Sequence, residues 1–391
     1  MAVAAETSVI RNAVNQAIKG LFIGDSVAMP VHWYYDVPAI KRDFGGWIYK
    51  YEAPKNDHPT SILRVSNKGG SGRDDGSQAP SVIGTVILHD KLRAWSEESK
   101  HTHYHQGMEA GDNTLNCHCA LQIMRTLQNC TGKGYNDAEV MKQVFTDYVD
   151  FMTTPESHND TYAESWHRML FADWVVAGKP TDKDELYSFL TKRSEVIYKQ
   201  PPDKQLVVIG GFVVPTPIIL HYIDRPLAEV IKVAELFLRC THPVSGILEP
   251  FYLYIGILHA VVRGASLRDE AEKALLEVLG PTGKAMIKKF DSIVQESNDR
   301  LEAFQNIAQQ LGIACYIDSS FAVLLYIVRH FHDDFVGGIL TNVNIGGENC
   351  HRGSVVATLL GASIGSKGKT IPDEWTTGLK LNDSVDKLIF K

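Results

Sequence analysis

NIGGENCHRG, residues 344–353, runs directly into SVVATLLGASIG, residues 354–365. Paired glycines between two helical runs allow a ligand to approach the backbone closely. Four reactive side chains follow the pair at once: Glu348, Cys350, His351 and Arg352. A plain connecting loop seldom carries all four, so we interpret residues 344–353 as a functional loop. The small-residue run after it predicts a closely packed helix.

Helical periodicity surrounds this stretch. Residues 9–28 predict a helix in which Gly20 and Gly24 lie four apart on one face, a spacing typical of close helix packing. Apolar residues also recur at helical spacing after Pro226 and after Ser266, which starts a pattern like a capping box.

Strand signals are few. Residues 206–214 are apolar and β-branched, but glycines and a proline interrupt them, so their type stays open. No internal repeat or low-complexity linker divides the chain. The simplest prediction is an all-α protein with one domain over residues 1–391.

The composition of the chain argues against some classes of binding partner. The net charge of -7 and the pI near 6.1 argue against nucleic acid as the main partner, because phosphate binding needs a basic face. We expect no membrane span, because no uninterrupted apolar run reaches about 18 residues, and the N-terminus does not read as a secretory signal. Six cysteines in 391 residues favour reduced thiols, and a cytoplasmic location is the default expectation.

Two further polar segments suggest a site. In residues 104–114, Asp112 or Asn113 can be the N-cap of the following helix. Alternatively, their carboxylate and amide groups point into a cleft at the N-terminus of that helix. In residues 158–162, His158, Asp160 and Tyr162 fit either a solvated helix start or a binding site. The run Cys117-His118-Cys119 has the wrong spacing for a structural zinc site, and core packing explains it better.

In this order, the segments resemble the ADP-ribosylglycohydrolase family, which includes the J-type lens crystallins of jellyfish. GLFIGD at residues 20–25 matches the family's Gly-x-x-x-Gly-Asp, and GDNT at 111–114 stands in place of a Thr-Asp-Asp-Thr-like metal motif. Thr241-His242 matches a mid-chain Thr-His pair. GGENCH at 346–351 aligns with the Gly-Gly-Asp-x-Asp-Thr that precedes a small-residue helix. The resemblance covers roughly residues 9–380.

The resemblance implies an orthogonal all-α bundle whose cleft usually holds two magnesium ions, with hydrolysis of a ribosyl bond by carboxylate-activated water. The aligned metal positions here are Asp112, Asn113, Glu348 and Cys350. Magnesium prefers hard oxygen ligands, so a soft thiol and a neutral amide weaken the site. One weakly held magnesium ion and no metal at all both remain open, with Asp112, Asn113 and Glu348 as the candidate ligands.

We predict that the Asp112 and Glu348 side chains converge on one cleft, with either as general base and His351 as acid. Arg352 suits a phosphate or carboxylate of the ligand. The candidate substrate-binding residues are Asp25, His105, Asn113, His158, Asp160, Tyr162 and Arg352. The substrate is expected to be a small molecule or an ADP-ribosylated compound. Two alternatives stay open: a metal-free reaction using Glu348 and His351, or a non-catalytic, crystallin-like binding or structural protein. The oligomeric state stays open.

Overall fold

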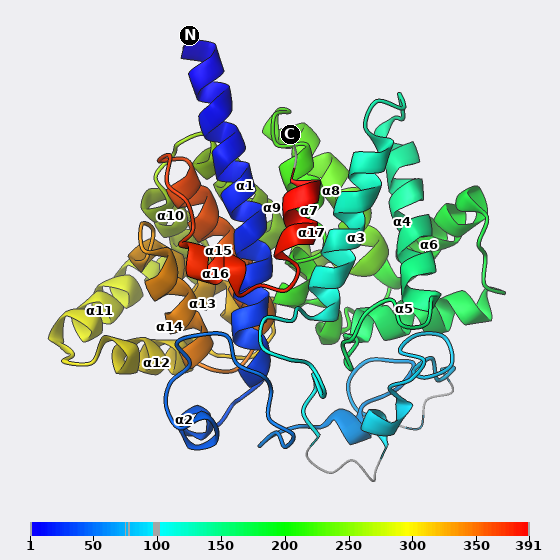
Figure 1. Cartoon of the computed structure of the whole chain (residues 1–391), viewed down its shortest axis with the longest axis horizontal. Coiled ribbons are helices and arrows are strands. Elements are labelled where there is room, and N and C mark those ends of the chain that lie inside the picture. The colour runs from blue at the N-terminus through cyan, green and yellow to red at the C-terminus, as the bar shows by residue number, and fades with distance from the viewer. Residues whose placement is uncertain (1, 75, 77–78, 97–101, 390–391) are drawn as a thin grey trace. The chain divides into compact units, whose positions relative to one another are not determined.

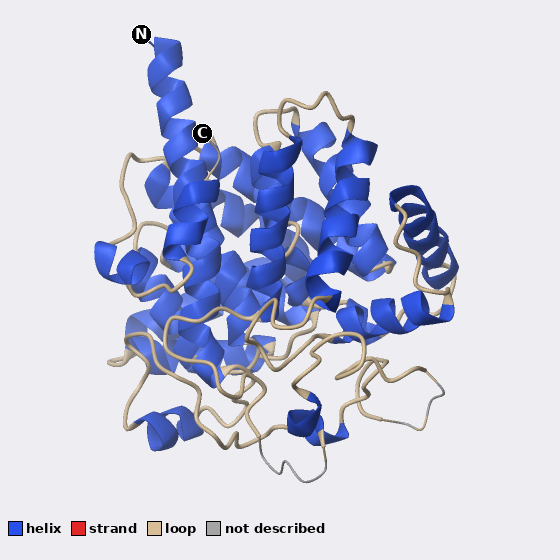
Figure 2. Ribbon diagram, turned by 45° about the vertical axis from the view of Figure 1, so that its right-hand side comes forward, coloured by secondary structure: helices blue, strands red, loops and turns tan. Residues whose placement is uncertain are grey.

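The computed structural model of the chain describes residues 2–74, 76, 79–96 and 102–389. Within these ranges the regular structure is helical, and Figure 2 shows helices joined by loops, with no strand drawn. The described residues also form four isolated β-bridges. The predicted all-α class is therefore confirmed.

The helices belong to two compact units, which are described separately. The first contains residues 2–53, 110–113 and 250–389, and the second contains the described parts of 54–109 and 114–249. The prediction of one domain over 1–391 stays a prediction, because this grouping does not say whether either unit folds alone.

The first unit holds the chain's N-terminal helices and roughly its C-terminal third, whose elements are labelled in Figure 1. Its helices are α1 (Ala2–Ala28), η1 (Met29–Val31), α2 (Pro38–Phe44), most of α9 (Leu248–Val262), α10 (Leu267–Leu279), η7 (Gly280–Thr282), α11 (Gly283–Glu296), α12 (Arg300–Leu311), α13 (Ile317–His330), α14 (Phe335–Asn344), α15 (Asn349–Gly365), α16 (Asp373–Thr377) and α17 (Asn382–Leu388).

The second unit begins with irregular chain and continues with helices. These are η2 (Leu63–Val65), η3 (Leu92–Trp95), α3 (Leu115–Cys130), α4 (Asp137–Thr153), α5 (Ser165–Val176), α6 (Lys183–Tyr198), η4 (Lys204–Leu206), η5 (Ile209–Phe212), α7 (Thr216–His221), α8 (Leu227–Thr241) and η6 (Ser245–Ile247). The ambiguous run at 206–214 thus forms short 3₁₀ turns rather than a strand.

The core of the first unit is the crossing of α1 and α15, which lie side by side in Figure 1. A Cβ on Gly20 would stand 2.1 Å from the Ala357 carbonyl oxygen, and one on Gly24 would stand 2.1 Å from that of Gly353. Both glycines are therefore required by backbone-to-backbone packing, as their spacing predicted. Every described residue of α15 is buried, which explains its small side chains.

Helix ends follow the sequence signals only in part. Ser266 caps α10 by accepting from the Asp269 amide, as predicted. The N-cap of α3 is Thr114 rather than Asp112 or Asn113, and the Asp160 carboxylate accepts from the Leu115 amide. The sequence missed this because the acceptor lies 45 positions away.

One described segment, Ser245–Val262, is long and apolar enough to cross a membrane by length and composition. Half of it is buried in the structure, and a buried core helix passes the same test. It is weak evidence, and the expectation of no membrane span stays a prediction.

Candidate functional site

Three segments that are far apart in sequence meet at Asp25, near the end of α1. Asp25 is fully buried. The Asn113 side-chain amide donates to Asp25 Oδ2 at 2.8 Å, and the Cys350 thiol lies 3.3 Å from both Asp25 Oδ1 and the Asp25 backbone carbonyl oxygen as possible acceptors. The segments around residues 25, 113 and 350 are the three that carried most of the family resemblance, so the first unit brings those motifs together.

Asp112 lies beside this junction in sequence but has its own partner. Its carboxylate is 3.2 Å from the Lys380 ammonium, and 11% of its side chain is exposed. Gly111, at φ +86°, holds the loop against the chain near Lys380, whose amide donates to the Gly111 carbonyl at 3.0 Å. Whether Asp112 and Glu348 share one cleft stays a prediction.

Glu348 is the centre of a second buried cluster in the same unit. It is the N-cap of α15, and its Oε1 accepts from the His351 amide at 3.1 Å. Oε1 also lies 2.9 Å from His32 Nε2 and 3.2 Å from His351 Nδ1. All three side chains are almost fully buried. Helix α15 thus begins at Asn349, earlier than the small-residue run suggested, which places His351 in its first turn.

The two imidazoles set the charge of this cluster. Burial alone would raise the pKa of the Glu348 carboxyl, but the adjacent His32 and His351 rings hold that pKa well below its usual range. Glu348 is therefore ionised at neutral pH and serves poorly as a proton acceptor. Its geometry suits orienting the two rings.

Two glycines and a short backbone pairing fix the cluster. The Trp33 amide donates to the Gly347 carbonyl at 2.8 Å, and the Gly347 amide donates to the Tyr34 carbonyl at 2.9 Å. Gly346 and Gly347 have φ of +72° and +65°, and a Cβ on Gly347 would stand 2.0 Å from the Ile313 carbonyl oxygen. The pair therefore permits a close backbone approach, which places Glu348 beside His32.

Arg352 is fully buried and stabilises the functional loop, residues 344–353, through hydrogen bonds. Its Nε donates to Asn342 Oδ1 at 2.8 Å and its Nη2 donates to the Gly346 carbonyl at 3.0 Å. Burial lowers the pKa of Arg352 to about 10, although the Glu348 charge opposes this shift. These contacts give Arg352 a structural task, and its predicted ligand contact stays a prediction.

The remaining predicted residues lie in the second unit. His105 Nδ1 is 2.7 Å from Asp160 Oδ1, and the same carboxylate accepts from the Leu115 amide. Burial alone would raise the pKa of Asp160, but His105 and the Leu115 amide lower it to about 2. Burial also lowers the pKa of His158 to about 4. Segment 158–162 is therefore not a solvated helix start, since Asp160 is buried and supports α3.

Tyr162 and the Thr241-His242 pair also lie in the second unit. The Tyr162 ring stacks on Trp95, with ring centroids 5.7 Å apart. His242 Nδ1 is hydrogen-bonded to the Thr241 hydroxyl at 2.9 Å, and burial lowers the pKa of His242 to about 3. The ring is therefore neutral at physiological pH.

Sequence reasoning missed two parts of these clusters. His32 was not among the predicted site residues, because nothing in its local sequence links it to Glu348. In the second unit, Glu164 accepts from the Asn116 amide at 2.6 Å, and Asn116 is hydrogen-bonded to His167 at 3.1 Å. Glu164 and His167 follow segment 158–162 closely in sequence, but no local pattern pairs them with Asn116.

The magnesium pair implied by the family does not fit these residues. Asp25 is engaged by donors from Asn113 and Cys350, and the thiol acts as a hydrogen-bond donor rather than a ligand. Among the described residues, the one group of three or more histidine, cysteine and acidic side chains that could hold an ion is His32, Glu348 and His351. That group contains neither Asp112 nor Cys350, and two of its members are nitrogen donors.

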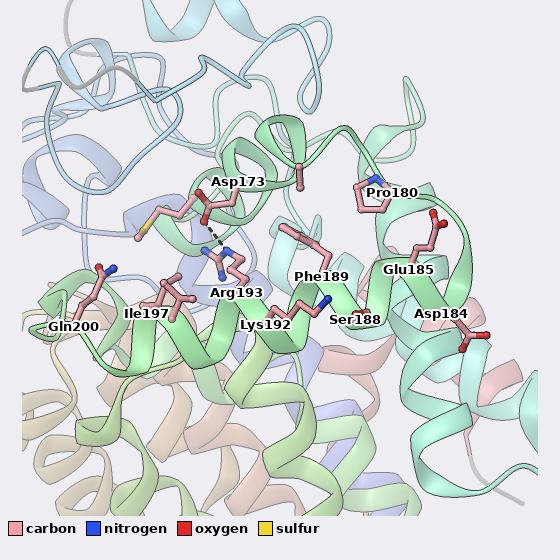
Figure 3. A pocket seen from close by; sticks show the side chains of 13 residues that line it. Asp173, Pro180, Asp184, Glu185, Ser188, Phe189, Lys192, Arg193, Ile197 and Gln200 are labelled. Atoms are coloured by element: carbon pink, nitrogen blue, oxygen red, sulfur yellow. Dashed lines mark hydrogen bonds and ion pairs between the residues drawn. The ribbon is translucent and has the colours of Figure 1, made fainter.

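A separate groove of about 1070 Å³ lies between α5 and α6 in the second unit (Figure 3). Met169, Phe189 and Ile197 line it, and Arg193 pairs with Asp173 at 2.6 Å along its wall. The described lining residues include none that the sequence singled out, so the groove is not part of the candidate site.

Comparisons with known proteins agree with the motifs. The sequence model described as ADP-ribosylglycohydrolase matches residues 6–390. No curated protein sequence matches the chain. A solved structure titled "ADP-ribosylglycohydrolase-related protein complex" is similar over 97% of this chain and 96% of its own, with 15% identity and a TM-score of 0.53, a likeness that concerns the fold alone. Because the family match spans nearly the whole sequence, the chain belongs to the ADP-ribosylglycohydrolase family.

Proposed function

We propose that this chain is a glycohydrolase-type hydrolase that cleaves an N- or O-ribosyl bond, or a related glycosidic bond, using a carboxylate-activated water. Its substrate is a small molecule or an ADP-ribosylated compound. The observation that carries the proposal is the meeting of three family motif segments at Asp25. Membership of the family supports the reaction class.

The two candidate carboxylates suit different tasks. Asp112 keeps part of its side chain accessible, whereas Glu348 is fully buried between imidazoles. A general base must reach the proton that it removes. We therefore assign water activation to Asp112, and to Glu348 the orientation of His351, which supplies a proton to the leaving group.

The proposed reaction does not depend on a magnesium pair. Asn113 and Cys350 place hydrogen-bond donors on Asp25 where a binuclear site needs anionic oxygen ligands. The substrate must instead be held by side chains and backbone, for which the Asn113 side-chain oxygen is suited. That oxygen is buried and has no hydrogen-bond partner among the described residues.

The test is turnover of ADP-ribosyl-arginine and of an O-ribosyl counterpart by the protein as purified, with and without added magnesium. We expect release of ADP-ribose that does not require magnesium and that is lost in Asp112→Asn. Asp373→Asn, which removes an exposed carboxylate of the same unit, is the matched control and should keep full activity. Full turnover in Asp112→Asn would refute the assigned base.

A second candidate function is a different small-molecule reaction that uses Glu348 and His351 without metal, and their close pairing favours it. It predicts that ribosyl compounds are not consumed and that ADP-ribose does not raise the melting temperature. Stabilisation by ADP-ribose would exclude this candidate in favour of the ribosyl hydrolase.

A further inference from the structure

The cluster around Glu348 has the composition of a transition-metal site. His32, Glu348 and His351 each offer one ligand atom, and these atoms lie within 4.8 Å of one another. Two imidazole nitrogens and one carboxylate are a ligand set used for zinc and for non-haem iron. Magnesium takes oxygen ligands, so this set separates the site from the magnesium chemistry of the family.

The distances suit a shared ion. Ligand atoms bound to one zinc ion at about 2.0–2.2 Å stand roughly 3 Å from each other. Glu348 Oε1 is 2.9 Å from His32 Nε2 and 3.2 Å from His351 Nδ1. The two imidazole rings meet at an interplanar angle of 81°, with centroids 4.9 Å apart. Two of the three separations between ligand atoms therefore already match those around one bound ion.

A second observation points to a ligand here. Glu348 Oε2 is buried and has no hydrogen-bond partner in the described part of the chain. A buried carboxylate oxygen that lacks a hydrogen-bond partner destabilises the fold, and more so when the group is charged. A cation bound beside Oε1 and Oε2 removes that destabilisation.

The surrounding backbone holds the donors in place. The Tyr34–Gly347 pairing ties the segment of His32 to that of Glu348, and the Glu348 amide donates to the Ile313 carbonyl at 2.8 Å. His351 is fixed by the first turn of α15. Catalytic and binding metals are favoured where such supports fix the ligands in advance.

We propose that His32, Glu348 and His351 form a binding site for one divalent transition-metal ion, with zinc as the first ion to test. Binding needs neutral imidazoles that carry their proton on the nitrogen facing away from the ion, so a proton on the binding nitrogen must be released or move to the other ring nitrogen. Arg352 adds a positive charge nearby, which favours water, hydroxide or an anionic group as the remaining ligand.

The experiment measures zinc binding to the metal-depleted full chain by competition with a chromophoric chelator. We expect one zinc per chain and an affinity that falls at least about tenfold, the lower limit for outer supports of metal sites, in both His32→Gln and His351→Gln. Asp112→Asn and Cys350→Ser are controls outside the cluster and should bind as the wild type does. No zinc binding, or unchanged binding in both histidine variants, would overturn the proposal.

Cobalt substitution of the wild type gives a readout that needs no variant. X-ray absorption should show a nitrogen and oxygen shell that includes imidazole, and no sulfur. Sulfur ligation would assign the ion to cysteines and overturn the site. The inference does not rest on the proposed hydrolase: zinc binding without ribosyl cleavage overturns only the function, and cleavage by a protein that binds no zinc overturns only the site.

Discussion

Gly20→Ala tests the packing on which the site is built. The added Cβ would stand 2.1 Å from the Ala357 carbonyl oxygen and 3.2 Å from the Thr358 amide nitrogen, both backbone atoms that cannot rotate away. Helices α1 and α15 must therefore separate, and overpacking of this kind costs about 2–3 kcal/mol. Alanine recovers about 0.5–1 kcal/mol over glycine within a helix. The net loss of stability is therefore about 1–2.5 kcal/mol.

Gly256→Ala is the matched control, since Gly256 is a helical glycine of α9 in the same unit. A Cβ there would meet no heavy atom of the described chain within 4 Å. It should gain about 0.5–1 kcal/mol from helix propensity alone. Urea unfolding followed by circular dichroism should thus move in opposite directions for the two variants. A higher midpoint for Gly20→Ala, as for Gly256→Ala, would refute the close crossing of α1 and α15.

Three further predictions concern metal, pH and capping. Magnesium should bind more weakly than to a relative with intact motifs, and Asn113→Asp with Cys350→Asp should tighten it in calorimetry; two tight sites in the wild type would contradict this. Because the folded pKa of Asp160 is about 2, below the usual 3.8, it stabilises the fold above pH 4 by about 2 kcal/mol, and this is lost as pH falls to 2. In Asp160→Asn, the unfolding free energy should depend less on pH between pH 4 and pH 2 than in the wild type. An unchanged pH dependence would contradict the assigned role of Asp160. Ser266→Ala should cost about 1 kcal/mol in urea unfolding, and no change would mean that the cap is not needed.

Local patterns predicted what depends on neighbours in sequence. The spacing of Gly20 and Gly24 gave the tight helix contact, because a face of α1 is defined by its own periodicity. Ser266 indicated the start of α10 because its capping partner, the Asp269 amide, is only three residues away. The glycine pair before Glu348 predicted a ligand beside the backbone, and that contact stays a prediction. In the structure the pair admits the carbonyl groups of Tyr34 and Ile313, which lie far away in sequence.

Long-range partners could not be predicted from these patterns. His32 and Glu348 are 316 positions apart, and a single histidine near a proline has many ordinary explanations. The N-terminus of α3 is satisfied by Asp160 rather than by a neighbouring side chain. The two acceptors, Glu348 and Asp160, stand out in the sequence as polar residues in an apolar context. Their donors are brought to them only by the tertiary fold.

The substitutions in the family motifs are chemically connected rather than scattered. With Asn and Cys at positions 113 and 350, two potential metal ligands have become donors to Asp25, which consumes the carboxylate that a magnesium centre would need. At position 348, a glutamate reaches His32 and pairs with His351. We expect the first change to weaken binding of a hard cation, and the second places nitrogen donors around the buried Glu348 carboxylate. Loss of the magnesium ligands alone would not produce the contacts of Glu348 with His32 and His351. We infer that a different ion or a different proton transfer at Glu348 accounts for both sets of substitutions.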